Sequence, residues 1–292
     1  MTEPRLRHVH CLDPSGLHRM AYWEWGDAHN PRVLVCVHGL SRQGRDFDTL
    51  ARDLADRYRV VCPDVVGRGQ SDWLREPMGY GLPLYVADMV TLLARLDAES
   101  VDWVGTSMGG LIGIALAALE RSPIRRLVLN DVGPVVQPAF LQRLSTYLGV
   151  PAHWRTLDEA ADALLAISPG FGPHTREEWL ALTRPQLVPD DRDGRPGLKP
   201  HYDPAIAVPV RAMTPAIAAA GQALLWQMYD RIAASTLLLR GAQSDLLSVD
   251  TAQEMRQRGP RASVQQFEGV GHAPTLVAAE QRAVVRRFLL GA

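Results

Sequence analysis

Cysteine is scarce in this sequence, with only three residues among 292. Cys11, Cys36 and Cys62 are too widely separated for the short spacing of a metal-binding motif. Cys36 and Cys62 lie inside apolar runs that read as buried strands. We therefore expect free thiols, which are typical of a reducing compartment.

Long apolar runs and an excess of charge are also lacking. No stretch reaches the roughly 18 apolar residues that a spanning helix needs, and the first eight residues contain no apolar leader. The 31 Lys and Arg side chains against 32 Asp and Glu give a formal net charge of -1, which offers no general attraction to nucleic acid or to an anionic membrane. We expect a cytoplasmic protein, monomeric or homodimeric, whose partner is a small molecule.

From residue 33 onward, short β-branched apolar runs alternate with longer helical patterns. This alternation is typical of βαβ units, so the sequence predicts an α/β fold with a mostly parallel, doubly wound sheet. The predicted strands are 33–37, 59–62, 101–104, 126–130, 236–239 and 263–267. The predicted helices around them are 47–54, 84–96, 111–119, 249–257 and 276–290.

The alternation stops between residues 133 and 227, where prolines are frequent and no clear strand is visible. Helical patterns such as 138–148 remain, which indicates an inserted helical module between two parts of a core domain, 1–132 and 228–292. Within the module, residues 190–197 are polar and rich in turn formers, so we expect an exposed loop there.

A Gly-x-Ser-x-Gly pattern, from Gly105 to Gly109, joins a predicted strand to a predicted helix. In such a nucleophile elbow, the tight turn exposes the serine beside the helix N-terminus, and small flanking residues let strand and helix approach. Ser107 is therefore the candidate nucleophile.

A serine nucleophile needs a base, and nine histidines are available. His272 follows the last predicted strand in a Gly-His-Ala-Pro loop, at the sheet end where the elbow also lies. We predict that His272 is the base. We expect surface or hydrogen-bonding roles for His8, His10, His18, His29, His153, His174 and His201.

The base needs a carboxylate partner, which in this architecture falls between nucleophile and base in chain order. Two residues qualify: Asp245, in a loop after the strand 236–239, and Asp131, directly after the strand 126–130. We favour Asp245, because its loop contains small residues and lies nearer in sequence to His272, and keep Asp131 as the alternative.

Acyl transfer also requires donors for the developing oxyanion. The amide of Met108, which follows the nucleophile, is one candidate, and the amide of Leu40, in the loop after strand 33–37, is the other. His38 in that loop is better read as a group that fixes the loop than as a second base.

Together, His38-Gly39, the elbow, the Asp245 loop and Gly271-His272 resemble the α/β-hydrolase superfamily, in its lid-bearing serine esterase branch. The resemblance extends from about residue 20 to the C-terminus. It implies that 133–227 forms a lid over the catalytic triad and that Asp64, in a loop that also matches the family, has a structural role. Ser107, Asp245 and His272 would form the triad.

This resemblance implies hydrolysis of a small carboxylic ester, thioester or lactone through an acyl-enzyme on Ser107, without metal or organic cofactor. Two alternatives stay open. Carbon–carbon bond hydrolases of aromatic degradation share the Ser-Met-Gly-Gly elbow but usually carry an aromatic residue where this chain has Ala273, and other relatives are ligand receptors. Aromatic residues of the lid either pack internally or line a pocket: Trp154, Phe171, Trp179, Tyr202 and Trp226.

Overall fold

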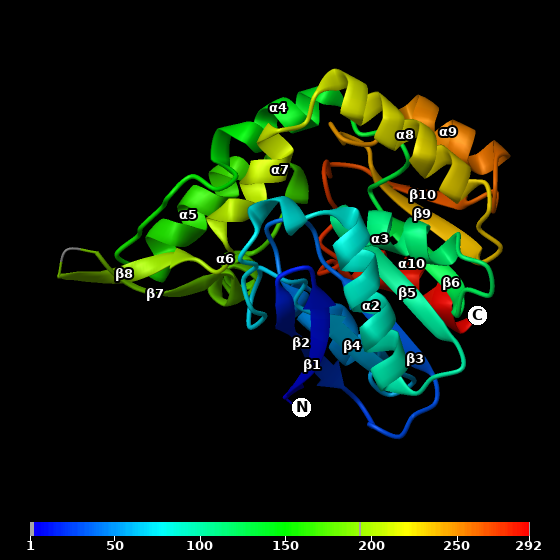
Figure 1. Ribbon diagram of the computed structural model, residues 1–292, viewed down its shortest axis with the longest axis horizontal. Helices are drawn as coiled ribbons and strands as arrows, with labels where there is room; N and C mark the ends of the chain where they lie inside the picture. Colours follow the sequence, from blue (N-terminus) through cyan, green and yellow to red (C-terminus); the bar gives the residue numbers. More distant parts are fainter. Residues whose placement is uncertain (1–2, 193, 292) are drawn as a thin grey trace.

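The structure, a computed structural model, describes residues 3–192 and 194–291; Met1, Thr2, Asp193 and Ala292, which the predicted domain ranges include, lie outside them. Its centre is an eight-stranded sheet in the order β1-β2-β4-β3-β5-β6-β9-β10 (Figure 1). The last six of these strands are parallel to one another. They are β3 (Val33–Val37), β4 (Arg59–Pro63), β5 (Val101–Thr106), β6 (Ile124–Asn130), β9 (Ser235–Gly241) and β10 (Ser263–Phe267).

All six predicted strands are present, two of them with the predicted bounds. Five of them are rich in β-branched residues and leucine because helices cover both faces of the sheet, whereas β10, at the sheet edge, is mostly exposed. Along β3, Val33, Val35 and Val37 belong to one hydrophobic core, whereas Leu34 and Cys36 belong to the other. The α/β fold with a mostly parallel sheet is thus confirmed.

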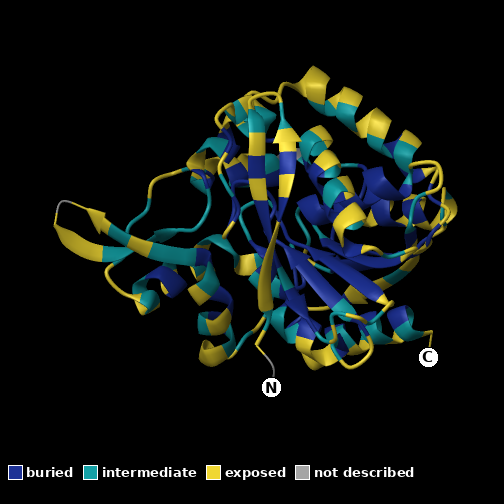
Figure 2. Cartoon of the chain, turned by 60° about the horizontal axis from the view of Figure 1, so that its bottom comes forward, coloured by how far each residue is buried: buried dark blue, intermediate teal, exposed yellow. Residues whose placement is uncertain are grey.

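Six helices form the two covering layers. Residues of α2, α3, α8 and α9 share one core, and residues of α1 and α10 share the other. Figure 2 shows that the strands in the middle of the sheet are buried, while the surrounding helices carry exposed residues on their outer sides. The helices are α1 (Asp48–Leu54), α2 (Leu82–Leu96), α3 (Met108–Ala117), α8 (Pro215–Tyr229), α9 (Val249–Gln257) and α10 (Ala279–Leu290). Short 3-10 helices occur at Gly44–Phe47, Pro77–Gly79, Pro169–Phe171, Arg184–Gln186 and Pro204–Ile206.

An antiparallel pair, β1 (Arg5–Asp13) and β2 (Gly16–Trp25), extends the sheet beyond β4. These two strands were not predicted from the sequence, and His8, His10 and His18 lie on them. The pair escaped prediction because β1 is mostly exposed, as expected of an edge strand, and so lacks the apolar run of a buried strand.

The segment between β6 and α8 lies to one side of the sheet (Figure 1). It contains α4 (Pro138–Tyr147), α5 (Leu157–Ile167), α6 (Arg176–Thr183), α7 (Ala207–Arg211) and a hairpin of β7 (Leu187–Arg192) with β8 (Arg195–Pro200). The loop expected at 190–197 is therefore mostly hairpin, apart from the undescribed Asp193. Within the described residues, 133–227 contributes no strand to the central sheet.

The predicted end of the insertion at residue 227 falls inside α8. Helix α8 packs against α3, and Trp226 and Tyr229 near its end are buried in the core shared with the sheet. The helix therefore covers the sheet, and we use 138–211 for the inserted segment below. The predicted boundary lay too far along the chain because the first half of α8 is largely exposed and therefore lacks the pattern of a helix that covers a sheet.

All three cysteines are free and buried, in agreement with the sequence-based expectation. Within the described part of the chain, no helix has both the length and the apolar character required to cross a bilayer.

Candidate active site

Ser107 lies in the turn between β5 and α3, with a backbone φ of 52° and ψ of -117°. This conformation is strained for a residue with a side chain, and close packing around the turn maintains it. A Cβ on Gly105 would lie 2.3 Å from the Gly109 carbonyl oxygen, and one on Gly109 would lie 2.0 Å from the Val37 oxygen. Both glycines are therefore required where the strand and helix approach each other.

The hydroxyl of Ser107 points at His272, whose Nε2 lies 3.0 Å from Ser107 Oγ. The other ring nitrogen, Nδ1, lies 2.8 Å from Asp131 Oδ2. Asp131 is fully buried. With Nδ1–H donating to the carboxylate, Nε2 is free to accept the serine proton, so the three side chains form a chain suited to general-base activation of Ser107.

Asp131 directly follows β6 and is held from the neighbouring loop. Its Oδ1 accepts the Gly241 amide at 2.8 Å, and its Oδ2 also accepts the Ser244 hydroxyl at 2.6 Å. The carboxylate thus has donors on both oxygens, which fix its orientation toward His272.

The preference for Asp245 as partner of His272 is wrong in this structure, which brings Asp131 there instead. Asp245 pairs with Arg143, whose Nε and Nη2 lie 2.6 Å and 3.1 Å from its oxygens. Partial burial works against ionisation of Asp245, but the hydrogen bonds and charge of Arg143 outweigh it and lower the pKa of Asp245.

Strand order explains this correction. Strand β6, which Asp131 directly follows, lies next to β5, which Ser107 directly follows, whereas β9 lies one strand further away. The small residues that pointed to the Asp245 loop do serve the site, since Gly241 and Ser244 hydrogen-bond to Asp131. Proximity in the sequence to His272 was a misleading criterion.

Asn130, which the sequence reasoning did not single out, ties the histidine loop to the elbow strand. Its Nδ2 donates to Thr106 Oγ1 at 2.9 Å and to the Pro274 carbonyl at 2.8 Å. The sequence does contain a signal that could have identified Asn130: it is a polar residue at the last position of an apolar strand, directly before a candidate aspartate.

The two amides expected to bind the oxyanion are those of Leu40, in the loop after β3, and of Met108, directly after Ser107. Among the described residues, neither the Leu40 nor the Met108 amide has a hydrogen-bond acceptor. The Leu40 loop is fixed by His38, whose Nδ1–H donates to the Gly39 carbonyl at 2.7 Å while Nε2 accepts the Val65 amide at 2.9 Å. Complete burial lowers the pKa of His38 to about 3. His38 is therefore a neutral group of the loop.

Arg68, a second supporting residue that sequence reasoning missed, is fully buried beneath this loop. Its Nε donates to the Leu40 carbonyl at 2.7 Å, and its Nη1 donates to the Val66 carbonyl at 2.7 Å. These bonds fix the backbone of the Leu40 loop from below.

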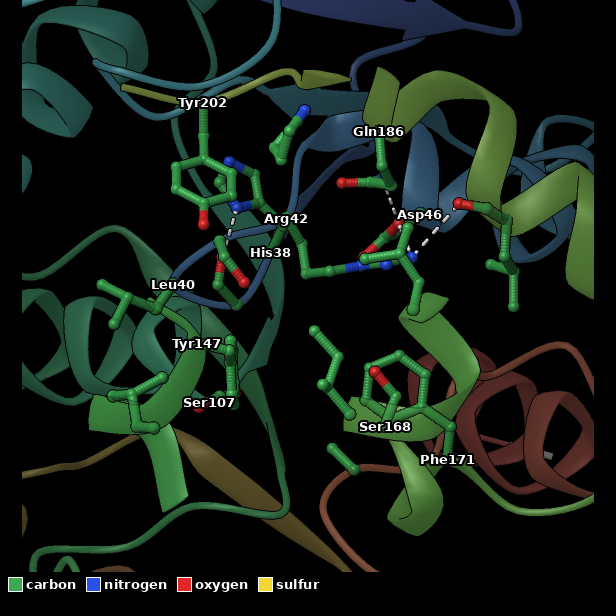
Figure 3. A pocket seen from close by; sticks show the side chains of 18 of the residues that line it. His38, Leu40, Arg42, Asp46, Ser107, Tyr147, Ser168, Phe171, Gln186 and Tyr202 are labelled. Atoms are coloured by element: carbon green, nitrogen blue, oxygen red, sulfur yellow. Dashed lines mark hydrogen bonds and ion pairs between the residues drawn. The ribbon is translucent and has the colours of Figure 1, made fainter. Parts of the chain in front are cut away.

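A cavity of about 300 Å³ opens above Ser107, between the sheet loops and the inserted segment (Figure 3). Of the five aromatic residues considered from sequence, Trp154, Phe171 and Tyr202 line it, whereas Trp179 and Trp226 are buried elsewhere. The lining is mostly apolar, with Leu144, Tyr147, Val150, Leu164 and Ile167 among its residues. Such a cavity suits a small, largely apolar substrate.

One group of side chains in the described residues could hold a metal ion: Cys11, His18 and Asp88. His18 already has a carboxylate on each ring nitrogen, with Asp13 Oδ2 3.1 Å from Nδ1 and Asp88 Oδ2 3.0 Å from Nε2. The group lies between the β1–β2 pair and α2, apart from Ser107. We interpret it as a buried ion-pair cluster that ties the sheet edge to the helix.

Comparisons with known proteins identify the family of the chain. A family model described as "Alpha/beta hydrolase family" matches residues 34–287. The chain is 54% identical over 291 residues to the 3-hydroxybutyrate-oligomer hydrolase of Cupriavidus necator, with 99% of each chain covered. It is 27% identical to the 2-hydroxy-6-oxo-2,4-heptadienoate hydrolase of Pseudomonas putida, over 84% of this chain and 83% of that one.

Among solved structures, an α/β hydrolase from Novosphingobium aromaticivorans is similar over the full length of both chains, with a TM-score of 0.85 and 35% identity. The region that the family model matches includes Ser107, Asp131 and His272.

Proposed function

Since this chain belongs to the α/β-hydrolase family, we propose that it hydrolyses carboxylic esters through an acyl-enzyme formed on Ser107. The observation that carries the proposal is the hydrogen-bonded chain from Ser107 through His272 to Asp131, set beneath an apolar cavity. The relationship to an ester hydrolase that is 54% identical over nearly the whole chain supports hydrolase activity on esters.

In this mechanism, His272 Nε2 takes the proton of Ser107 as its oxygen attacks the ester carbonyl. Asp131 keeps the Nδ1–H tautomer and stabilises the imidazolium that forms. The amides of Leu40 and Met108 donate to the oxyanion, each worth about 2.7–4 kcal/mol of the barrier. His272 then protonates the leaving alcohol and activates the water that releases the acid.

The substrates we propose are oligoesters of 3-hydroxybutyrate. The support is the identity to the Cupriavidus necator enzyme, together with the size and apolar lining of the cavity, which accommodates short methyl-bearing units. We further propose that the segment 138–211 acts as the lid expected from sequence and sets substrate preference, since Phe140, Tyr147, Trp154 and Phe171 of this segment line the cavity.

The test is hydrolysis of the 3-hydroxybutyrate dimer by Ser107→Ala. The variant should lose roughly four to six orders of magnitude in kcat while keeping its thermal stability, because the serine supplies a reactive oxygen rather than packing. Ser168→Ala, which removes another hydroxyl that lines the cavity, is the matched control and should stay active. A fluorophosphonate should label wild type at Ser107. Labelling at another residue with loss of activity would refute the assignment.

Carbon–carbon bond hydrolysis is the second candidate, because the Pseudomonas putida relative and the Ser-Met-Gly-Gly elbow both favour it. A ring-cleavage product such as 2-hydroxy-6-oxo-2,4-heptadienoate, assayed beside the dimer, separates the two. Preferential turnover of the ring-cleavage product would replace ester hydrolysis as the main reaction, and turnover of neither would favour a ligand receptor.

A further inference from the structure

Two arginines line the otherwise mostly apolar cavity, and they differ in what remains of their hydrogen-bonding capacity. Arg143, on α4, has an acceptor at every guanidinium nitrogen: its Nε and Nη2 contact Asp245, and its Nη1 lies 3.4 Å from the Ile167 carbonyl. A ligand would find no guanidinium nitrogen of Arg143 without an acceptor already in the fold.

Arg42 follows the Leu40 loop and is only partly engaged. Its Nε and Nη2 each lie 2.7 Å from an Asp46 oxygen, and Nη2 also lies 3.2 Å from the Leu182 carbonyl. Its Nη1 has no hydrogen-bond partner among the residues that the structure describes. Figure 3 shows Arg42 at the cavity, beside Asp46 and Gln186.

The contacts of Arg42 fix its guanidinium plane before any ligand arrives. Asp46 is held in turn by Gln186, whose Nε2 donates to Asp46 Oδ1 at 2.8 Å. The guanidinium carbon also lies 5.5 Å from the centre of the Phe171 ring. An arginine held in this way loses little conformational freedom when it binds an anion, although Asp46 offsets part of its charge.

Arg42 is also close to the nucleophile. A Cβ built on Gly39 would lie 3.7 Å from Ser107 Cβ and 3.9 Å from Arg42 Cγ, so both side chains start close to the same glycine. In a dimer of 3-hydroxybutyrate, four bonds separate the scissile carbonyl carbon from the carboxylate carbon, a span of about 5 Å with bonds of roughly 1.5 Å. An arginine side chain is long enough to span that distance.

We propose that Arg42 binds the terminal carboxylate of the substrate through Nη1 and thereby places the ester bond nearest the carboxyl end over Ser107. This assignment rests on the proposed oligoester hydrolysis and adds the recognised group and the cleaved bond. The leaving product is then 3-hydroxybutyrate, with its carboxylate on Arg42 while His272 protonates its new hydroxyl.

The experiment compares the 3-hydroxybutyrate dimer with its methyl ester, which lacks the negative charge but keeps the internal ester bond. Arg42→Gln should lower kcat/KM for the acid by about 10- to 100-fold, mainly through KM, and leave the internal ester bond of the methyl ester nearly unaffected. Arg143→Gln is the matched control and should not change the ratio of kcat/KM for the acid to kcat/KM for the methyl ester. Arg42→Met serves as a second neutral variant if Arg42→Gln does not fold.

Each outcome decides a different point. Equal losses on acid and methyl ester in the Arg42 variants, or a selective loss in Arg143→Gln, would overturn the carboxylate assignment and leave ester hydrolysis standing. A wild-type protein that cleaves neither compound would overturn the proposed function and the assignment with it.

Discussion

The pKa values of two buried histidines, His18 and His38, are shifted in opposite directions by their surroundings. His38 accepts a backbone amide and stays neutral, with its pKa lowered to about 3 by burial. Burial also acts to lower the pKa of His18, but hydrogen bonds and charges from Asp88 and Asp13 outweigh it and raise that pKa. The hydrogen-bonding partners and charges around each ring therefore decide the direction of its pKa shift.

A pH-dependent contribution to stability follows for His18. Its folded-state pKa lies above the unfolded value near 6.5, so the contribution is complete below that value and is lost as pH rises through the folded-state pKa. Burial raises the pKa of Asp88, and the hydrogen bond and charge of His18 oppose this shift. His18→Gln should cost on the order of 1–3 kcal/mol of unfolding free energy at pH 6 and clearly less at pH 8.5.

Urea denaturation of wild type and variant at both pH values measures this difference. His10→Gln is the control, because His10 lies on the same edge pair but is exposed. An equal cost of His18→Gln at pH 6 and pH 8.5 would show that the ion pairs do not contribute as described.

At the scale of elements, the parallel strands and their helices were predictable because burial on both faces leaves a clear apolar signature. The hairpin of β7 and β8 was not, since Asp190, Asp191 and Gly197 are typical turn formers and its residues are mostly half-exposed or exposed. The edge strand β1 likewise shows mainly polar residues. Elements that bury little surface have no clear hydrophobic pattern, so they are difficult to predict from the sequence.

The inserted segment contributes aromatic side chains to the lining of the cavity, and we predict that one of them, Phe171, affects substrate preference. Phe171 borders the cavity and stacks edge-on with Trp179 at a centroid distance of 6.0 Å. Phe171→Ala should lower kcat/KM for the 3-hydroxybutyrate dimer by about tenfold, because an apolar contact with the substrate is lost. It should lower kcat/KM for p-nitrophenyl acetate much less.

Leu165→Ala changes an exposed residue of the neighbouring α5 outside the cavity and serves as the control. If Phe171→Ala leaves the preference between the two esters unchanged, the segment 138–211 does not set specificity through this residue.

At the scale of the whole molecule, the site is assembled from loops whose order in space differs from their order in the sequence. Ser107 and His272 were predictable, since each follows a strand in a recognisable local pattern. The carboxylate partner of His272 was not predictable, because Asp131 and Asp245 both follow strands. Only the strand order shows that β6 lies next to β5. Hydrogen bonds between distant segments, such as Ser244 to Asp131, have no local sequence signal.

The measurement that tests the account most directly is turnover of one activated ester by Asp131→Asn and Asp245→Asn side by side. Asp131→Asn should reduce kcat by about four orders of magnitude, because the amide cannot hold the tautomer of His272 that accepts the Ser107 proton. Asp245→Asn loses only its pairing with Arg143 and should stay near wild-type rates. An active Asp131→Asn enzyme beside an inactive Asp245→Asn enzyme would contradict the triad of Ser107, His272 and Asp131.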